Sequence, residues 1–274
     1  MRFRIFQDTR IGRRHTNQDR TGYAYGKDDV VLVAADGMGG HPRGELAAHI
    51  AVESVLNHFA TWVRTGGCDA EDMLRTGFGV AHAAIRQCAE QERLYDYPRT
   101  TCTACVVHAG VALWCHVGDT RLYMVRNDEV LATTRDHSGA WLLVELGVIA
   151  PDEARVHPDR NFVYNCLGGE IGPEIEMAQP VTLQVGDRII LCTDGFWSSV
   201  TNAEIVAALV RDATQTGLYR LLRDAESRAG AVADNVTYIA LAVEDEAGKD
   251  PIDTATLAAG EVVKHFGFEC AQAT

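Results

Sequence analysis

Residues 29–52, DVVLVAADGMGGHPRGELAAHIAV, place an apolar run, an aspartate, a glycine-rich turn and the start of a helix in direct succession. The run 30–35 has the length and the β-branched content of a buried strand. From 44 to 64 the apolar residues recur every three to four positions, which predicts a long amphipathic helix. Such a strand–turn–helix unit can serve as a phosphate-binding glycine loop or can carry a metal ligand at the strand end.

The glycine-loop alternative fails on spacing and on charge. A dinucleotide fingerprint requires G-x-G-x-x-G, but after Gly37 and Gly39 the third glycine position holds Pro42. Asp36 would also place a negative charge beside the pyrophosphate, which is unfavourable unless a cation intervenes. A Walker-type G-x-x-x-x-G-K-[ST] is absent as well. The stretch therefore favours a metal ligand.

The same design recurs along the chain. Asp119 ends the run LWCHVGD, Asp194 ends RIILCTD, and Asp234 precedes the strand-like 235–243. One such aspartate usually marks only a turn, but carboxylates from several strand ends that meet at one edge repel each other and require cations. Carboxylate, carbonyl and water ligands select Mg²⁺ or Mn²⁺ over zinc. Two such ions, about 3.5 to 4 Å apart, convert a shared water into a strong nucleophile.

The remaining chain reads as short strands interrupted by helices. Strands are predicted from Val, Ile, Thr and aromatic content at 3–11, 101–108, 112–117, 121–126, 129–134, 187–193 and 236–243. Helices are predicted at 70–95, 139–146, 202–211 and 216–228. Two-residue connections such as Asn127-Asp128 fit hairpins. This order predicts an α+β fold, with a mostly antiparallel sheet core covered by helices.

Composition limits the partners and the location. The chain has 25 Lys and Arg residues and 38 Asp and Glu residues, which gives a formal net charge of −13. The basic residues form no cluster in the sequence, so nucleic acid is not an expected partner. The N-terminus lacks the apolar stretch of a signal peptide, and no apolar run approaches the roughly 18 residues of a membrane span. A cytoplasmic protein with no membrane contact is expected, and we expect a monomer.

The eight cysteines lie mostly in apolar segments, which predicts reduced core residues. Cys102 and Cys105 have the spacing of a zinc or redox motif, but there is no second such pair. On a regular strand these two side chains point to opposite faces, so they cannot share one ion. Core packing is the favoured interpretation.

Arg13 and Arg14 precede the polar turn HTNQD. Adjacent arginines at a strand end are usually a solvated pair. Beside a carboxylate-bound metal centre, however, a guanidinium can bind phosphate oxygens through two parallel hydrogen bonds. An anionic substrate of the predicted centre would need such a cation.

Taken together, these segments resemble the metal-dependent PPM phosphatases of bacteria, the protein phosphatase 2C type. The resemblance spans residues 5–244 and rests on segments that occur in the family's order: RHTNQD (14–19), DGMGGHPRGELAA (36–48), VGDTRLYMVRNDEV (117–130), TRDHSGAWLLVELGVI (134–149), HPDRN (157–161), GDRIILCTDGFWSSV (186–200) and DNVTYIALAV (234–243).

The resemblance implies a four-layer α/β/β/α sandwich of two mostly antiparallel sheets in residues 1–245. It also implies a centre of two Mn²⁺ or Mg²⁺ ions, with a third more labile ion. By this resemblance Asp36 would bridge the two ions, the Gly37 carbonyl would bind one of them, and Asp194 and Asp234 would complete the ligands. Asp119 would bind the third ion, and Asp19 would act through metal-bound water. Arg14 would bind the substrate phosphate. Residues 136–161, called the flap below, would shape substrate access.

The chain departs from many eukaryotic relatives at two positions. Gln18 stands where those relatives carry Glu, so it cannot supply an anionic ligand. Met38 stands where their proposed general-acid histidine follows Asp-Gly. His41, three residues on, is a candidate acid, although a histidine in a glycine loop is more often structural. A metal-bound water is the alternative proton donor.

We therefore expect a serine/threonine protein phosphatase in which a metal-bridging hydroxide attacks phosphorus, and which opposes a bacterial serine/threonine kinase. Two alternatives remain open: a phosphatase of one dedicated regulator or of a small phosphomonoester, and a catalytically inactive module that binds phosphorylated partners. The extension 246–274 follows a charged break containing Gly and Pro, and one short helix is predicted there at 254–266.

Overall fold

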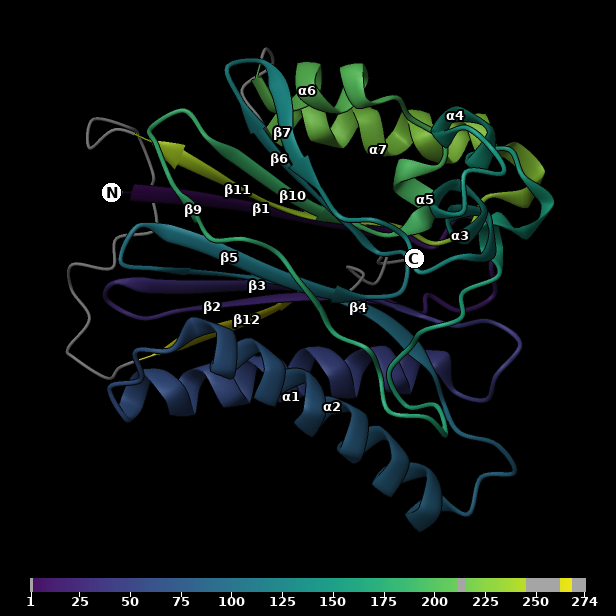
Figure 1. Ribbon diagram of the computed structural model, residues 1–274, viewed down its shortest axis with the longest axis horizontal. Helices are drawn as coiled ribbons and strands as arrows, with labels where there is room; N and C mark the ends of the chain where they lie inside the picture. The colour runs from purple at the N-terminus through teal and green to yellow at the C-terminus, as the bar shows by residue number, and fades with distance from the viewer. Residues whose placement is uncertain (1, 211–214, 245–261, 268–274) are drawn as a thin grey trace, which may run out of the picture.

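Two antiparallel β-sheets lie face to face between two layers of helices in this computed structural model, which describes residues 2–210, 215–244 and 262–267 (Figure 1). Sheet A contains, in spatial order, β1 (Arg2–Arg10), β11 (Val236–Glu244), β10 (Arg188–Cys192), β6 (Arg121–Arg126) and β7 (Glu129–Thr133). Sheet B contains β12 (Val263–Gly267), β2 (Asp19–Tyr25), β3 (Asp29–Gly37), β4 (Thr100–His108), β5 (Val111–Val117) and β8 (Glu176–Met177), and β9 (Val181–Thr182) also pairs with β5.

The helices form the outer layers. Sheet B is covered by α1 (Gly44–Arg64) and α2 (Ala70–Glu92), and sheet A by α5 (Asp194–Trp197), α6 (Asn202–Val210) and α7 (Gln215–Ala229) (Figure 1). The flap contains α3 (Gly139–Glu145), α4 (Pro151–Ala154) and the 3₁₀ turn η1 (Pro158–Asn161), and a second 3₁₀ turn, η2 (Gly230–Val232), precedes β11. The predicted four-layer α+β sandwich is confirmed.

The apolar run of β3 is continuous because both of its faces are buried. Val31, Val33 and Ala35 pack against the helices α1 and α2. The alternate residues Val30, Leu32 and Ala34 pack in the layer between the two sheets. A strand covered on both sides needs no polar alternation, and α1 presents its apolar stripe to the outer face. Residues 29–64 thus establish two of the four layers.

The register of the strands brings distant acidic residues to one edge. Antiparallel pairing places Asp19, at the start of β2, opposite Asp36, near the end of β3. In sheet A, the end of β10 pairs with the start of β11, with Cys192 opposite Tyr238. The residues that follow β10 and precede β11 therefore meet at the same edge.

Most elements predicted from the pattern are present within one or two residues of the expected ends, and the recorded strand pairs are all antiparallel. The hairpin between β6 and β7 turns at Asn127 and Asp128, whose φ angles of 51° and 61° suit a type I′ turn. The prediction missed β2, whose glycine and charged residues are poor strand formers. It also missed the short elements α4, α5, β8 and β9.

The helix expected at 254–266 is wrong at its C-terminal end. Residues Val263–Gly267 form the strand β12, which pairs antiparallel with β2 and extends sheet B. Phe266 packs against the core beneath α1, so the strand buries apolar surface while it covers the edge of β2. Residues 254–261 lie outside the described part of the chain.

The cysteines largely follow expectation. Cys102 lies in the layer beneath the helices and Cys105 in the layer between the sheets, so the two side chains do occupy opposite faces. Cys115 and Cys192 are also buried, Cys88 and Cys166 are half-buried, and Cys68 is exposed and is not a core residue. Cys270 lies outside the described part of the chain. Within the described ranges, no helix combines the length and the apolar character that a bilayer span requires.

Candidate metal centre

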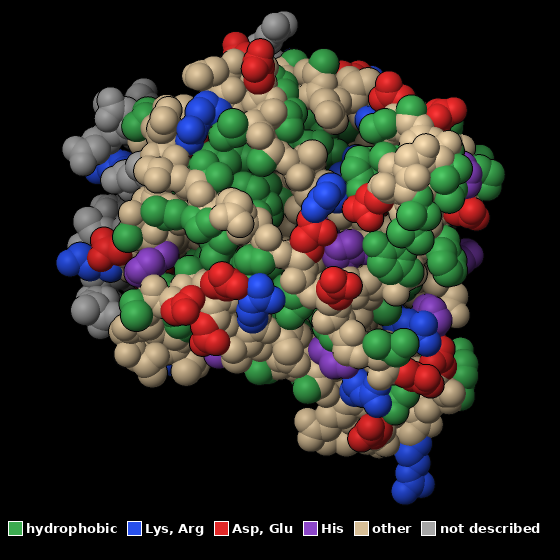
Figure 2. All heavy atoms as spheres, viewed as in Figure 1, with side chains coloured by type: hydrophobic (Ala, Val, Ile, Leu, Met, Phe, Trp, Pro, Cys, Tyr) green, Lys and Arg blue, Asp and Glu red, His purple; other side chains and the backbone are tan. Residues whose placement is uncertain are grey.

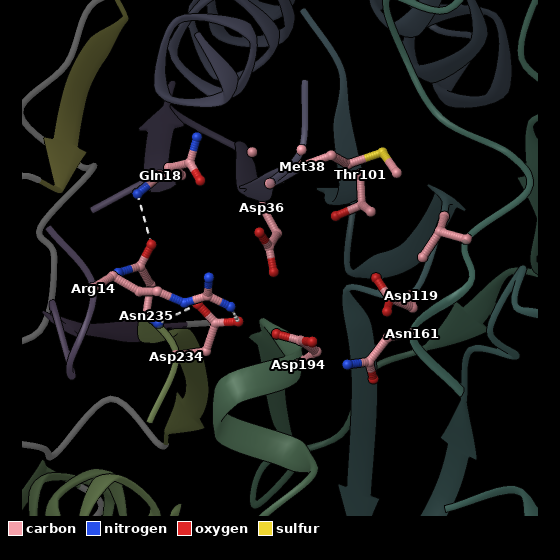
Figure 3. Close-up of a pocket in the computed structure, with 14 residues that line it drawn as sticks. Arg14, Gln18, Asp36, Met38, Thr101, Asp119, Asn161, Asp194, Asp234 and Asn235 are labelled. Carbon is pink, nitrogen blue, oxygen red and sulfur yellow. Dashed lines mark hydrogen bonds and ion pairs between the residues drawn. The ribbon is translucent and has the colours of Figure 1, made fainter. Parts of the chain in front are cut away.

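A cavity of about 280 Å³ opens at the edge where the strand ends converge (Figure 3). It is bounded by the glycine turn after β3, by the loop between β1 and β2, and by the end of the flap. The lining residues are Arg14, Gln18, Asp36, Gly37, Met38, Gly39, Gly40, Thr101, Asp119, Asn161, Val163, Asp194, Asp234 and Asn235. Six of the eight residues singled out from the sequence are among them.

Four carboxylates face this cavity from four different segments. Asp36 comes from the end of β3, Asp119 from the turn after β5, Asp194 from the start of α5, and Asp234 from the residue before Asn235 and β11. Their side chains point toward a common space (Figure 3). The structure therefore brings together the aspartates that the sequence separates by up to 198 positions.

The glycine turn is held tightly over Asp36 by a close backbone approach. A Cβ atom added to Gly37 would lie 2.3 Å from the carbonyl oxygen of Gly44, the first residue of α1. Only glycine fits at such a distance. This packing keeps the Gly37 carbonyl beside the cavity, which is the position expected of a backbone ligand.

Asp19 lies beneath the cavity rather than on its wall. The residue is only 2% exposed, and its Oδ2 accepts a hydrogen bond of 2.8 Å from the Thr193 hydroxyl. Its Oδ1 is buried without a hydrogen-bond partner. Buried polar atoms are nearly always paired, so an unpaired carboxylate oxygen beside other carboxylates fits a cation or a cation's water.

The acidic cluster is electrostatically strained. Burial, together with the charges of neighbouring aspartates, raises the pKa of Asp19 to about 7 and that of Asp194 to about 6. Burial, followed by the charges of Asp19 and Asp194, also lifts the pKa of Asp36 well above its usual value. Burial and the Asp194 charge do the same for the pKa of Asp119. The carboxylates must either keep protons or gain cations.

Arg14 is the only cationic side chain among the described residues that line the cavity. Its Nη2 donates a 2.6 Å hydrogen bond to Asp234 Oδ2, while more than half of the side chain stays exposed at the rim. One guanidinium cannot balance four carboxylates. The donor set consists of oxygen atoms, which hard divalent cations such as Mn²⁺ and Mg²⁺ prefer, so the residues fit such ions.

Asn235 is a site residue that the sequence analysis did not assign. Its Oδ1 accepts a 2.7 Å hydrogen bond from the Gln18 backbone N–H, and its Nδ2 donates to the carbonyls of Ile11 and Thr16 at 2.9 and 3.2 Å. It thereby fastens the loop that carries Arg14 to the start of β11. The sequence feature that could have identified Asn235 is its amide side chain directly after the candidate ligand Asp234. Thr101, Asn161 and Val163 also line the cavity and carried no comparable signal.

His41 is not brought to the cavity. Its Nδ1 pairs at 2.9 Å with Asp96 Oδ2, in the connection between α2 and β4. This contact, with the Tyr97 backbone N–H, lowers the pKa of Asp96. His41 and Asp96 thus tie the glycine turn to the next connection, which is the structural role of a histidine in such a loop.

We expect His41→Gln to retain kcat within about threefold, because the ring does not line the cavity, whereas a general acid contributes roughly 10²- to 10⁴-fold. Release of phosphate from a phosphothreonine peptide at saturating Mn²⁺ measures this directly. A loss of kcat of a hundredfold or more, with an unchanged unfolding temperature, would show that His41 takes part in the reaction.

Comparison with known proteins places these features in a family. The family model described as Protein phosphatase 2C matches residues 7–229. The serine/threonine protein phosphatase PstP of Mycobacterium tuberculosis is 33% identical over 217 residues, which cover 78% of this chain but only 40% of that relative. Protein phosphatase PhpP of Streptococcus pneumoniae is 28% identical over 246 residues, covering 87% of this chain and 96% of that one.

The fold agrees with solved structures. The serine/threonine phosphatase of S. agalactiae superposes with a TM-score of 0.77 at 27% identity, covering 88% of this chain and all of that one. The catalytic domain of PstP in complex with two manganese ions superposes with a TM-score of 0.71 at 27% identity, over 89% of this chain and 99% of that one.

Proposed function

Because this chain belongs to the protein phosphatase 2C family, we propose that it is a metal-dependent phosphatase that hydrolyses phosphoserine and phosphothreonine in proteins. The observation that carries the proposal is the convergence of Asp36, Asp119, Asp194 and Asp234 on one cavity with Arg14 at its rim. Two similar proteins are named serine/threonine protein phosphatase PstP and protein phosphatase PhpP, which supports this activity.

Two divalent cations, Mn²⁺ or Mg²⁺, are the proposed cofactors, as two manganese ions occupy the PstP structure. Asp36, Asp194, Asp234 and the Gly37 carbonyl would hold them, and Asp119 would serve a third ion. When bound, the cations supply an activated water and neutralise charge on the phosphoryl group. Asp19, with its unpaired buried oxygen, would orient water from below.

The residues of the chain then act on a phosphate monoester. Hydrolysis forms a bond from the water oxygen to phosphorus and breaks the bond from phosphorus to the serine or threonine oxygen, which gains a proton. Arg14 would bind the non-bridging phosphate oxygens, because a guanidinium carries five N–H donors and the recorded contact uses one on Asp234. Asn235 would keep Arg14 in reach through its bonds to the loop.

The surface beside the cavity favours a protein substrate over a small ester. Leu142, Leu146, Val148 and Val156 of the flap are exposed, and hydrophobic side chains gather around α3 on this face of the molecule (Figure 2). Exposed apolar surface of this kind marks sites of protein contact. The flap also reaches the cavity through Asn161, so a bound polypeptide could contact the flap and the centre together.

The test is release of phosphate from phosphoserine and phosphothreonine peptides, with para-nitrophenyl phosphate as the small ester. Activity on the peptides should require Mn²⁺ or Mg²⁺, vanish with a chelator, and return when the ion is restored. Metal-dependent turnover of the small ester without turnover of any phosphopeptide or phosphoprotein would contradict the substrate class. Absence of metal binding would contradict the centre itself.

Arg14→Ala should lower kcat/KM for a phosphothreonine peptide by roughly 10- to 100-fold, since a hydrogen bond to a charged group contributes about 1.5 to 3 kcal/mol. Arg13→Ala is the matched control, because Arg13 is an adjacent exposed arginine outside the cavity lining. Steady-state kinetics at saturating Mn²⁺ compare the two. Equal effects of the two substitutions would show that only the net charge of the loop matters.

We further propose that a serine/threonine kinase supplies the phosphorylated substrates, that both act in the cytoplasm, and that the phosphatase works as a monomer. The first point follows from the chemistry, because a phosphate monoester on a protein must be made before it can be hydrolysed. A monomer suffices because one chain provides every residue that lines the cavity.

A further inference from the structure

His137 is a buried histidine at the start of the flap that contacts the turn carrying Asp119. Its backbone N–H donates to the Gly118 carbonyl at 3.0 Å, and its ring Nδ1 accepts a hydrogen bond of 3.1 Å from the Gly118 N–H. The side chain is 9% exposed. One residue of the flap thus binds both polar groups of the glycine that precedes a cavity aspartate.

The hydrogen bonds determine which ring nitrogen carries the proton. Nδ1 faces two donors, the Gly118 N–H and the Asn165 side-chain amide at 2.8 Å. The Asn165 orientation is set by the Glu174 backbone, because its Oδ1 accepts from the Glu174 N–H at 3.1 Å and its Nδ2 donates to the Glu174 carbonyl at 2.7 Å. Nδ1 must therefore be unprotonated, and Nε2 carries the hydrogen, which it donates to Glu176 Oε2 at 3.3 Å.

The same group could be mistaken for a metal site, since ligand atoms of His116, His137 and Glu176 lie within 4.8 Å of one another. A metal-bound histidine donates its second ring N–H to an acceptor, but the second nitrogen of His137 meets two donors. His116 stacks on His137 with ring centres 4.6 Å apart and donates from Nε2 to the Arg135 carbonyl at 2.6 Å. His137 is instead hydrogen-bonded to Gly118, Asn165 and Glu176 in one network, on which His116 stacks.

The turn that this network holds needs external support. Gly118 has φ +97°, and a Cβ atom there would lie 2.4 Å from Thr101 Cγ2, so the position requires glycine. Glycine is the residue with the most backbone freedom. On the other side of the turn, Trp197 Nε1 donates to the Asp119 carbonyl at 2.9 Å. His137 and Trp197 therefore fix the Asp119 backbone from the flap and from α5.

We propose that His137, in the form protonated on Nε2, is a positioning residue that sets the Gly118–Asp119 turn for a divalent cation at Asp119. The inference rests on the proposed function only in assigning a cation to Asp119. Groups that orient a metal ligand from behind change metal affinity by roughly 10- to 100-fold when they are removed. The flap and the weakest cation site are then coupled through one side chain.

Two substitutions of His137 distinguish the roles of its two ring nitrogens. In His137→Asn, Oδ1 is bonded to Cγ as Nδ1 is, so the acceptor for the Gly118 N–H is kept and the donor to Glu176 is lost. In His137→Gln, the amide lies one atom further out, so the donor to Glu176 is kept and the acceptor for Gly118 is lost. The two substitutions therefore remove hydrogen bonds on opposite sides of the ring.

The measurement is a Mn²⁺ titration followed by electron paramagnetic resonance of free Mn²⁺ and by calorimetry, with the unfolding temperature recorded for each variant. We expect His137→Gln to weaken the weakest Mn²⁺ site of wild type by roughly tenfold or more. The tighter Mn²⁺ sites should be unchanged. His137→Asn should stay within about threefold of wild type. At limiting Mn²⁺, kcat of the Gln variant should fall and recover as Mn²⁺ is raised.

A second route leaves His137 in place, in case His137→Gln does not fold. Asn165→Asp puts an acceptor opposite Nδ1, which draws the proton to that nitrogen and breaks the bond from Gly118. It should weaken the same Mn²⁺ site, while Glu176→Gln, which keeps an acceptor for Nε2–H, should not. The Mn²⁺ titration gives this answer whether or not a phosphopeptide is turned over.

Three results would overturn the inference. The first is equal Mn²⁺ affinity in wild type, His137→Gln and Asn165→Asp. The second is a loss in His137→Asn as large as in His137→Gln, which would mean that the ring only fills space. The third is a zinc ion that wild type retains on dialysis and Glu176→Gln loses, which would make the network a metal site.

Discussion

Asp194→Asn is expected to reduce Mn²⁺-dependent release of phosphate from a phosphothreonine peptide by about 10³-fold or more, and Asp36→Asn should do the same. Each substitution keeps the shape of the side chain but removes a negative charge from the place where the cations bind. Metal ions provide both the nucleophile and most of the charge stabilisation in such a reaction. Losing one anionic ligand therefore removes more than a single hydrogen bond.

Asp224→Asn is the matched control, because Asp224 is an exposed aspartate on α7 outside the cavity. It should retain wild-type turnover. The unfolding temperature of every variant shows that the fold persists. Near-normal kcat in Asp36→Asn or Asp194→Asn at saturating Mn²⁺ would contradict the assignment of the metal centre to this edge of the sheets.

The second large effect is on the metal-free protein, whose unfolding free energy should fall as the pH rises from 5 to 7.5. The folded-state pKa values of Asp19 and Asp194, about 7 and about 6, exceed the value of roughly 3.9 for an unfolded aspartate. Between these values the folded state binds more protons than the unfolded state. The derivative of the unfolding free energy with pH is then negative.

Each pKa unit corresponds to about 1.4 kcal/mol, and burial lowers the pKa of His116 to about 4, which offsets part of the loss from the aspartates. The net loss across this window should be on the order of 3 kcal/mol. For a chain of this size that is a fall of roughly 10 °C in the unfolding temperature. Below about pH 4 the trend should reverse, because hydrogen bonds with His137 and Arg228 hold the pKa values of Glu176 and Glu204 at about 2. Those two carboxylates stabilise the fold only while they are ionised.

Calorimetry in chelator and in saturating Mn²⁺ separates the two states. Mn²⁺ should raise the unfolding temperature at pH 7.5, by roughly 5 to 10 °C at 100 times its dissociation constant. Metal-free Asp19→Asn should be more stable than wild type at pH 7.5 and should lose part of the pH dependence. A metal-free unfolding temperature that is flat or rises between pH 5 and 7.5 would mean that these carboxylates are not strained.

Local sequence was sufficient to predict the framework because each strong signal reflects either burial or the backbone conformation of a turn. The continuous apolar run of β3, the helical spacing over α1 and the Asn127-Asp128 turn all reflect local geometry that packing then reinforces. Aspartates at strand ends were informative for the same reason, since antiparallel register carries such ends to common edges.

The site could be predicted only in part. Asp36, Asp119, Asp194, Asp234 and Arg14 were recognised, but which of the neighbouring polar residues face the cavity depends on loop paths. His41 and Asn235 illustrate this: each lies close in sequence to a cavity aspartate, yet one pairs with Asp96 and the other fastens the Arg14 loop. Proximity along the chain does not fix the direction of a side chain in a turn.

The sequence by itself determined the order of the elements, the two-sided burial of the central strands and the acidic character of one edge, because these follow from patterns over a few residues. Only the tertiary structure decided that residues 263–267 form a strand on β2, that Asp19 is buried with an unpaired oxygen, and that His137 holds Gly118. Each of those depends on a partner far away in the chain, and local propensity carries no information about a neighbour that folding alone supplies.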